Sequence, residues 1–432
     1  MPDAAGHRWF TAGAFALVCA GASAGCGSHT PSPSLFAAPE PRPAVAAIAA
    51  NATPLSLEAP SSAGAEARRA GTEVRLLVAG DVLPHRPRLS SPERIALALA
   101  PMEALFQQAD LVVANYETAT GDPEKLGDRR LVYAASPEWM DAVRRANIGA
   151  LTLANNHACD LGARGLERSI DAADALGEIG LGAARDEAGP WAPRTLLERD
   201  GHRVCGIAWT TFVNSRGPAC ARGRMLAVAP LGRRGEAQVA RSVRAARGEG
   251  CDAVVAIFHG GLEYAPQVRP AKAQAAAAAE AGADAVIIHH PHVASPAFVI
   301  ATSDGRRVPV FASVGNLVSN QGESWKPSFP AAQRDRHLVY MNGWTRLGVV
   351  ADLAFRFRDA SPRAEVAWGY HLVWTENGHA DDKADPMPRV AVRPVDRDAD
   401  RAILEKLAKD KTGPGALFAD PCWIESGAPR CR

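Results

Sequence analysis

The stretch Ala285-Val286-Ile287-Ile288-His289-His290-Pro291-His292 joins an apolar run to three imidazoles within four residues. The apolar run has the length and the β-branched content of a buried strand. Imidazoles that leave such a strand are costly to bury unless a charge or a metal ion accompanies them. Open α/β sheets collect ligands at the carboxyl ends of their strands. The stretch therefore predicts a buried sheet that carries a ligand site at one edge.

Further short aliphatic runs lie on both sides of this stretch and alternate with helix-forming segments. We expect strands at residues 74–79, 111–114, 150–153, 204–209, 253–258, 285–288 and 308–312. Ser-Pro pairs at 91–92 and 136–137 place a capping hydroxyl before a proline at the first helical position, and 272–281 consists of strong helix formers. This alternation predicts an α/β fold with a largely parallel, buried sheet. Residues 347–357 and 366–373 are predicted to be antiparallel strands that form a second sheet or close the first.

Polar residues follow six of these predicted strands. They are Asp81, His85 and Arg86; Asn115 and Glu117; Asn155, Asn156, His157 and Asp160; His259, Glu263 and Tyr264; His289, His290 and His292; and Asn316. Carboxylates, amide oxygens and imidazoles together are typical of a mixed oxygen and nitrogen metal site, in which two ions could share a bridging carboxylate. Each motif alone is also explained by a structural polar loop. Their convergence favours a metal or anion site.

The N-terminal residues have the layout of a targeting segment. A short basic start precedes an apolar run that is too short for a confident membrane span and that ends in small residues before Cys26. This ending resembles the lipobox of bacterial lipoproteins, so residues 1–26 predict an exported protein lipidated at Cys26. Cleavage after Ala24 with plain secretion, or an uncleaved anchor, are the alternatives. Residues 27–70, rich in Ala, Pro and Ser, predict a disordered linker.

Composition narrows the functional classes. The 432 residues are 47% apolar and 22% charged, as in an ordinary soluble globular protein, and the net charge of +1 argues against a dedicated nucleic-acid binder. An exported chain could use its remaining cysteines in disulfides. We expect that Cys422 and Cys431 could staple the C-terminal tail and that Cys205 and Cys220 could close a surface loop.

The order and spacing of the motifs resemble the CapA family of capsule and poly-γ-glutamate biosynthesis proteins, over about residues 73–373. The family motifs match at Gly80-Asp81 with Arg86, at Asn115-Tyr116-Glu117, and completely at Asn155-Asn156-His157-Ala158-Cys159-Asp160-Leu161-Gly162. Further matches are His259, Gly261, Glu263 and Tyr264, then residues 289–293, then Ser313, Gly315 and Asn316. Two positions depart from the family pattern, since Gly260 replaces a Trp and Ile288 replaces a Gly.

This family is in turn similar to the calcineurin-like metallophosphatases, which implies an α/β fold in the form of a four-layer α/β/β/α sandwich. The resemblance implies the metal ligands Asp81, Glu117, Asn156, His259, His290 and His292, and the catalytic residues His157 and Asp160. Further residues implied to contact metal or substrate are His85, Arg86, Asn115, Asn155, Glu263, Tyr264, His289 and Asn316. Glu117 replaces a bridging aspartate, and His85 lies four residues after Asp81 instead of two. The second departure leaves one metal position in question.

Two classes of function follow from this resemblance. The first is a metal-dependent hydrolase, acting on a phosphoester or an amide with one or two divalent ions (Mn, Fe or Zn). The second is a non-catalytic accessory lipoprotein that binds or guides an anionic exopolymer. Arg86, Arg334 and Arg336 could bind such a polymer or be solvated surface residues.

The expected partners and domains complete the prediction. Partners are the anionic exopolymer or its precursor, the membrane through the lipid anchor, and a polymer synthase complex, with no nucleic acid. We expect one CapA-like domain at 71–375 and a C-terminal extension at 376–432. The extension should hold one helix at 397–409 and a Cys-containing tail, with residues 375–396 as loop.

Overall fold

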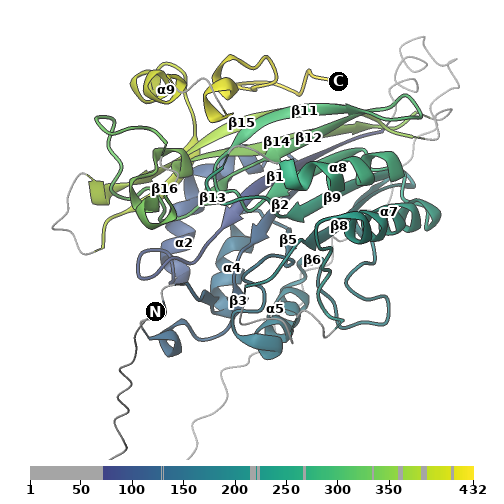
Figure 1. Ribbon diagram of the computed structural model, residues 1–432, viewed down its shortest axis with the longest axis horizontal. Coiled ribbons are helices and arrows are strands. Elements are labelled where there is room, and N and C mark those ends of the chain that lie inside the picture. Colours follow the sequence, from purple (N-terminus) through teal and green to yellow (C-terminus); the bar gives the residue numbers. More distant parts are fainter. Residues whose placement is uncertain are drawn as a thin grey trace, which may run out of the picture. The chain divides into compact units, whose positions relative to one another are not determined.

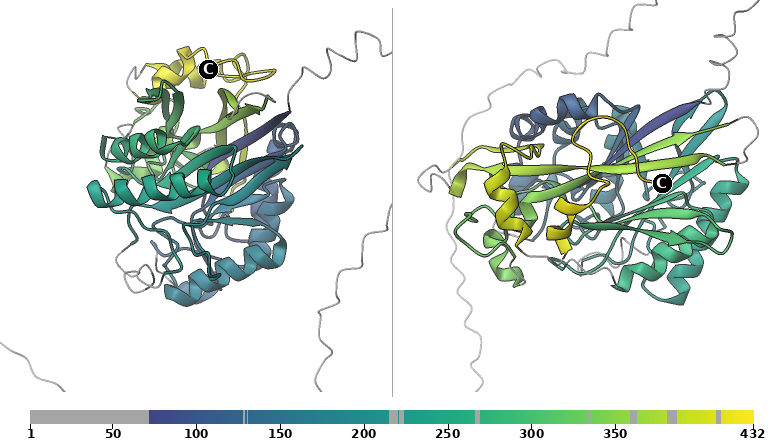
Figure 2. Two further views of the ribbon diagram at one scale, coloured as in Figure 1. Left: turned by 90° about the vertical axis from the view of Figure 1, so that its right-hand side faces the viewer. Right: turned by 90° about the horizontal axis from the view of Figure 1, so that it is seen from above.

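Two large β-sheets lie face to face in the described part of the chain, and helices cover the outer face of each, as the computed structural model shows (Figures 1 and 2). The structure describes residues 72–127, 129, 131–214, 220, 224–265, 269–332, 335–358, 363–380, 387–409 and 413–432. This arrangement is the predicted four-layer α/β/β/α sandwich. The predicted signal peptide, Cys26 and the predicted linker lie outside the described residues.

The first sheet contains eight of the described strands, in the order β16-β15-β14-β1-β2-β5-β6, with β13 paired to β1. Their bounds are β1 Glu73–Val82, β2 Leu111–Tyr116, β5 Ala150–Thr152, β6 Ile179–Leu181, β13 Asn316–Val318, β14 Leu347–Arg356, β15 Glu365–Asn377 and β16 Val390–Pro394. Strands β1, β2, β5 and β6 run parallel to one another, whereas β14, β15 and β16 are antiparallel to their neighbours.

The C-terminal strands of the first sheet differ in part from the prediction. The antiparallel strands predicted near the C-terminus extend the first sheet and do not form a second one. The prediction that 375–396 is loop was wrong in part, because this segment contains β16, which pairs with β15. The apolar run in β16 is only Val390-Ala391-Val392, too short for a clear period in the sequence.

The second sheet contains six of the described strands, in the order β11-β12-β10-β9-β8-β7. Their bounds are β7 Arg194–Arg199, β8 His202–Thr210, β9 Ala253–His259, β10 Ala285–His289, β11 Ser295–Ala301 and β12 Arg307–Ser313. The central strands β8, β9, β10 and β12 are parallel, and the two edge strands are antiparallel. A small parallel pair joins β3 (Ala119–Thr120) to β4 (Ala134–Ala135). The predicted parallel strands are thus divided between two sheets.

Helices α2 (Pro92–Leu99), α4 (Pro137–Arg145) and α5 (Gly162–Leu176) cover the first sheet, and α7 (Arg233–Gly248) and α8 (Arg269–Ala281) cover the second. The remaining helices are α3 (Glu103–Phe106), α9 (Arg401–Ala408) and 3-10 turns at Ala100–Met102, Pro123–Leu126, Arg336–Met341, Gly343–Arg346, Gly378–Ala380 and Gly413–Ala419. Ser91 and Ser136 cap α2 and α4 as predicted. No helix within the described ranges is long and apolar enough to cross a membrane.

Apolar side chains fill the three spaces between the four layers. Trp139 of α4 packs against the first sheet, Phe311 lies between the sheets, and Trp209 packs under α7 and α8. Each such side chain contributes roughly 1.5–3 kcal/mol by leaving water. Because both sheets are covered on both faces, their strands read as continuous aliphatic runs without alternation. The site must therefore form at the strand ends, where polar residues are available.

Three disulfides join described cysteines: Cys159–Cys220, Cys205–Cys251 and Cys422–Cys431. The predicted staple between Cys422 and Cys431 is confirmed. The predicted pair of Cys205 with Cys220 was wrong. Cys205 lies inside β8, and Cys251 stands just before the neighbouring parallel strand β9, so the two come together at the start of adjacent strands.

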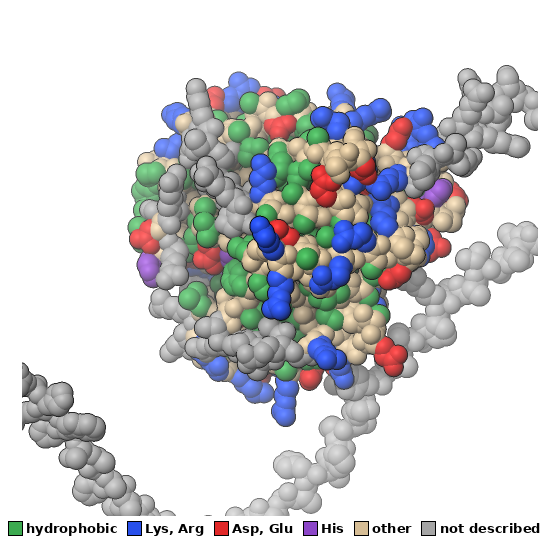
Figure 3. Space-filling view, turned by 45° about the vertical axis from the view of Figure 1, so that its right-hand side comes forward, with side chains coloured by type: hydrophobic (Ala, Val, Ile, Leu, Met, Phe, Trp, Pro, Cys, Tyr) green, Lys and Arg blue, Asp and Glu red, His purple; other side chains and the backbone are tan. Residues whose placement is uncertain are grey.

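Charged side chains are mixed on the face drawn in Figure 3. Lys and Arg are scattered among acidic and apolar side chains there and do not merge into one continuous basic surface. The near-neutral net charge of +1 is consistent with this mixture. Nucleic-acid binders usually gather their basic side chains on one face.

Candidate metal centre

The predicted strand-end residues converge from both sheets. Among the described residues, three overlapping groups bring ligand atoms within 4.8 Å of one another. The groups are Glu117-His259-His290, Asp81-Glu117-His292 and Glu263-His290-His292. Asp81 and Glu117 come from β1 and the end of β2 in the first sheet, whereas the three histidines come from β9 and the end of β10 in the second. The centre therefore lies where the carboxyl ends of the two sheets meet.

Glu117 is the most informative member of the centre. Its side chain is fully buried, and neither carboxylate oxygen has a hydrogen-bond partner. Oε1 lies 3.5 Å from Nε2 of His259 and 3.7 Å from Nε2 of His292. Burial, and after it the charge of Asp81, raises the pKa of Glu117 well above its ordinary value. A buried carboxylate without partners is expensive, and a bound cation would remove that cost.

Asn156 resembles Glu117 in this respect, although its side chain is neutral. Its Oδ1 is buried and has no hydrogen-bond partner, while its Nδ2 donates weakly to Oδ1 of Asn214 at 3.5 Å. An amide oxygen left open in this way is a suitable metal ligand. Together, the unpartnered oxygens of Glu117 and Asn156 and the adjacent imidazoles fit a divalent metal ion.

Asp81 is held on two sides. Its Oδ1 accepts a hydrogen bond from Nδ2 of Asn115 at 2.7 Å, and its Oδ2 lies 3.1 Å from Nδ1 of His292. Burial, the largest single effect, would raise the pKa of Asp81. The hydrogen bonds with His292 and Asn115 and the electrostatic effects of His289 and His292 together outweigh it, so the pKa is lowered. Burial would likewise lower the pKa of His292, yet Asp81 raises it. Nδ1 of His292 also lies 2.9 Å from Oδ1 of Asn316, so this imidazole is firmly oriented.

His259 and His290 face each other through ring nitrogens. Nδ1 of His290 lies 3.1 Å from Nε2 of His259. Burial lowers the pKa of His290 to about 3 and the pKa of His259 well below its ordinary value. Both rings are therefore neutral at neutral pH, which is the form that binds metal ions.

The backbone that carries His290 and His292 is strained. Their φ angles are 100° and 56°, in a region that non-glycine residues rarely adopt. Each such residue costs roughly 1–3 kcal/mol, a cost that is common at functional sites. The chain holds this conformation on both sides of Pro291, and both rings contribute ligand atoms to the same groups.

His157 and Asp160 form a hydrogen-bonded pair beside the metal ligands. Nδ1 of His157 lies 2.7 Å from Oδ2 of Asp160, and that oxygen also accepts a hydrogen bond from the backbone N–H of Tyr133 at 2.7 Å. The Tyr133 ring lies against the imidazole, with centroids 4.3 Å apart. A carboxylate that holds one ring nitrogen fixes the orientation of the other, which is the arrangement of a general acid.

Several predicted residues support the centre and do not face it. His85 lies between the hydroxyl of Tyr133 and the backbone N–H of Asn320, and burial lowers its pKa to about 3. It belongs to none of the three groups found among the described residues. Arg86 donates to backbone carbonyls of residues 123, 127 and 129.

The other supporting residues also bind backbone or neighbouring side chains. Asn155 donates to the Tyr116 carbonyl, and Nε2 of His289 lies 2.9 Å from the Ala79 carbonyl oxygen. The Tyr264 backbone N–H donates to the Pro291 carbonyl. Glu263, by contrast, is exposed but belongs to one of the three ligand groups. Arg334 and the side chain of Arg336 lie outside the described residues.

Sequence reasoning missed the segment that leaves β8. The Thr211 N–H donates to the His259 carbonyl, the Phe212 ring meets His290 edge-on at 5.0 Å, and Nδ2 of Asn214 lies 3.3 Å from Nδ1 of His157. Of the seven strands predicted in the alternating α/β part, this was the one to whose end no site residue was assigned. The rule used for the other strands would have found it.

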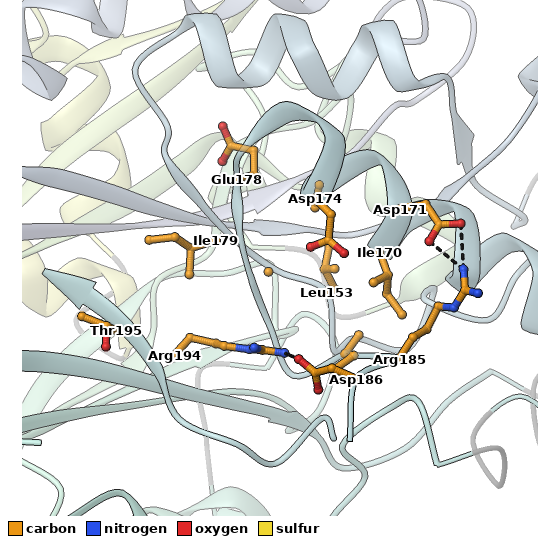
Figure 4. A pocket seen from close by; sticks show the side chains of 14 residues that line it. Leu153, Ile170, Asp171, Asp174, Glu178, Ile179, Arg185, Asp186, Arg194 and Thr195 are labelled. Atoms are coloured by element: carbon orange, nitrogen blue, oxygen red, sulfur yellow. Dashed lines mark hydrogen bonds and ion pairs between the residues drawn. The ribbon is translucent and has the colours of Figure 1, made fainter. Parts of the chain in front are cut away.

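A cavity of about 680 Å³ lies apart from the centre, beside α5, β6 and β7 (Figure 4). None of the residues that line it belongs to the three ligand groups. Its arginines are neutralised, because Arg185 pairs with Asp171 and Arg194 pairs with Asp186, both at 2.7 Å. This cavity therefore offers no unpaired cation to a ligand.

Comparison with known proteins places this centre in a family. The family described as bacterial capsule synthesis protein PGA_cap matches residues 75–321, more than half of the chain. The chain belongs to this family. The match begins in β1 and ends just after β13, so it includes every residue of the three ligand groups. The predicted CapA-family membership and the metallophosphatase-like α/β fold are thereby confirmed.

Two CapA relatives are similar to more than half of this chain. The chain is 27% identical over 253 residues to the PGA biosynthesis protein CapA of Bacillus subtilis (strain 168), covering 57% of this chain and 62% of that protein. It is 29% identical over 269 residues to the capsule biosynthesis protein CapA of Bacillus anthracis, covering 60% and 61%. The chain thus spans about three fifths of the length of these curated relatives.

Proposed function

We propose that this capsule synthesis protein is a metal-dependent hydrolase that acts on an anionic polymer of the cell envelope. The observation that carries the proposal is the buried carboxylate of Glu117, which lacks any hydrogen bond and stands among Asp81, His259 and His292. The proposed ligands for one or two ions (Mn, Fe or Zn) are Asp81, Glu117, Asn156, His259, His290 and His292. When bound, such an ion supplies a Lewis acid and lowers the pKa of a coordinated water.

The chain's own residues would complete the chemistry. His157, with Nδ1 held by Asp160 at 2.7 Å, is oriented to give a proton from its other nitrogen to a leaving group. Asn115 orients Asp81, and Asn316 orients His292, so both ligands are fixed before substrate binds. The buried setting strengthens every charge interaction at the centre.

The proposed substrate is a phosphoester or a γ-glutamyl amide within the polymer. The name of the Bacillus subtilis relative mentions PGA biosynthesis, and both relatives are named CapA, which supports a role in capsule or exopolymer synthesis. Export through residues 1–26, anchoring through a lipid on Cys26, and association with a polymer synthase complex are further parts of this proposal.

Metal content of the purified full chain tests the proposal first. We expect near-stoichiometric metal in the wild type and its loss in the His290→Ala, His292→Ala double variant. His337→Ala, which removes an exposed imidazole elsewhere, is the control and should keep its metal. Melting curves should show that all three proteins are folded.

A second measurement separates catalysis from binding. Model phosphodiesters and γ-glutamyl amides are screened with Mn, Fe and Zn, and His157→Ala should abolish turnover while retaining metal. A folded wild type that takes up none of the three metals would contradict the hydrolase proposal. The alternative, a non-catalytic accessory protein that binds the exopolymer, would then account better for the strand-end cluster.

A further inference from the structure

A second cavity, of about 540 Å³, is lined in part by basic side chains. Lys125, Arg129 and Arg168 line it, together with Gly121 and Leu161. It is formed by the 3-10 turn Pro123–Leu126, the start of α4 and the helix α5; β3, which leads into the turn, and α5 are labelled in Figure 1.

Among the described residues that line this cavity, the basic side chains outnumber the acidic ones. Asp122 is the one carboxylate among the described lining residues, and it pairs with Lys125 at 3.1 Å. Arg168 donates through Nε to the Thr120 carbonyl at 2.9 Å, and Arg129 donates to the carbonyls of residues 125 and 126. Within the described part of the chain, neither arginine forms an ion pair with a carboxylate. Two guanidinium charges are therefore available to an anion, and guanidinium groups suit carboxylates and phosphates.

Residues that line the cavity are close in the sequence to residues of the proposed reaction centre. Leu161 immediately follows Asp160, and Gly121 lies four residues after Glu117. Four residues of extended chain span at most about 14 Å, so the cavity lies within that reach of a metal ligand. A linear polymer with one unit at the metal centre could place another unit in the cavity.

The shape of the cavity adds an apolar element. Leu126 is buried and Leu161 is half-buried, and both line the cavity. A Cβ on Gly121 would lie 2.3 Å from Cδ1 of Leu161 and 3.1 Å from Nη2 of Arg168, so glycine allows these two side chains to approach. Basic and aliphatic side chains in one cavity suit a unit with a short aliphatic stem and a terminal negative charge.

We propose that this cavity is a subsite for an anionic side group of a linear polymer whose reacting bond lies at the metal centre. The inference rests on the proposed hydrolase function, which it deepens by placing a charged group of the polymer at Lys125, Arg129 and Arg168, outside the metal centre. Polycarboxylates and polyphosphates share this chemistry, so the experiment includes both.

Binding is measured by fluorescence anisotropy with the full chain in EDTA, at about 50 mM salt, where exposed charges are weakly screened. The probe is a labelled γ-linked hexaglutamate, and linear polyphosphate is the competitor. The test variant is Lys125→Ala, Arg129→Ala, Arg168→Ala. The matched control, Arg401→Ala, Lys409→Ala, Arg432→Ala, removes the same charge from exposed positions near the C-terminus.

We expect the test variant to bind roughly tenfold more weakly and the control to change less than about twofold, because only the test variant loses charges that line the cavity. Competition by polyphosphate at lower concentration than by unlabelled hexaglutamate would assign the subsite to phosphate. The reverse order would assign it to carboxylate.

Two outcomes would overturn the subsite: equal losses in the two variants, or no binding of either polymer by the wild type. Because EDTA is present, this experiment does not depend on the metal. Binding without any hydrolysis in the earlier assay would retain the subsite and reject the hydrolase, whereas hydrolysis without binding would do the opposite.

Discussion

Cys159 is joined by a disulfide to Cys220, 61 positions further along the chain. Cys159 lies between His157 and Asp160, so the bond fastens the loop that carries the proposed acid. The backbone N–H of Asn214 also donates to the Asn156 carbonyl at 3.0 Å, close to the same bond. The segment that leaves β8 and the loop that leaves β5 are thus tied together beside the metal centre.

Removing this disulfide should weaken both the fold and the centre. We expect Cys159→Ala, Cys220→Ala to lower the free energy of unfolding by about 2–4 kcal/mol. It should also lower metal affinity, because Asn156 belongs to the loop that the bond fastens. Urea denaturation and metal titration measure the two effects. The control is the double variant Cys205→Ala, Cys251→Ala. It opens a disulfide between two cysteines that are 46 positions apart in the sequence and that lie away from the ligands. It should lower the free energy of unfolding without lowering metal affinity. Equal losses of metal affinity in both variants would refute this role.

Asn214 should act as a positioning residue for His157. Its Nδ2 lies 3.3 Å from Nδ1 and 3.5 Å from Nε2 of that imidazole. Asn214→Ala should lower kcat about tenfold or more, within the range that general acid catalysis contributes, with little change in KM or metal content. Asn214→Ser, which keeps a polar side chain at this position, should recover part of the loss. Steady-state kinetics with the substrate found in the screen provide the measurement; a change confined to KM would assign Asn214 to substrate binding.

The sequence was sufficient to predict that these polar side chains gather at one edge, because strand ends mark that edge. It could not tell which side chain at a strand end faces the centre. His289 and His290 are adjacent, yet His289 lies against the Ala79 carbonyl of β1, while His290 lies against His259. The positive φ angle of His290 determines which of the two imidazoles faces the centre, and no local sequence pattern predicts this angle.

The fold was predicted less completely where strands are short or pairing is distant. β6 and β16 have three and five residues, too few to show a period. Cys205 was paired with a cysteine near in sequence, although the partner is set by the parallel register of β8 and β9. Register between strands separated by a helix is not visible in composition or spacing.

The substitution Glu117→Gln should stabilise the protein in the absence of metal and should make it less stable than the wild type when metal is bound. In EDTA the variant should be more stable than the wild type by about 1–2 kcal/mol, because a buried carboxylate without partners is lost. With metal at about 100 times its dissociation constant, the wild type should gain about 2.7 kcal/mol that the variant lacks. Urea denaturation in both conditions measures the reversal.

The control for Glu117 is Glu405→Gln, an exposed carboxylate on α9, which should leave stability unchanged in both conditions. If Glu117→Gln were less stable than the wild type in EDTA as well, the carboxylate would be a structural group with partners of its own. The fit of the centre to a metal ion would then lose its main support.

Glu178 offers a test of pH dependence away from the metal centre. It lines the cavity of Figure 4, is only 6% exposed, and has one carboxylate oxygen without a partner. Burial raises its pKa from 4.5 to about 7, against a smaller opposing effect of Arg144. An acid with a raised folded-state pKa binds its proton more tightly in the folded protein. Stability therefore falls as pH rises from about 4.5 to about 7, and the loss is complete above that range.

Glu178→Gln should remove this loss, because its side chain stays neutral at every pH. We expect the variant to be close to the wild type at about pH 5 and more stable by about 1–2 kcal/mol at about pH 8, a value reduced for water in the cavity. Urea denaturation at the two pH values measures the difference. Asp174→Asn, at an exposed carboxylate that lines the same cavity, should show no such change. A variant whose advantage is the same at both pH values would mean that Glu178 does not titrate between them.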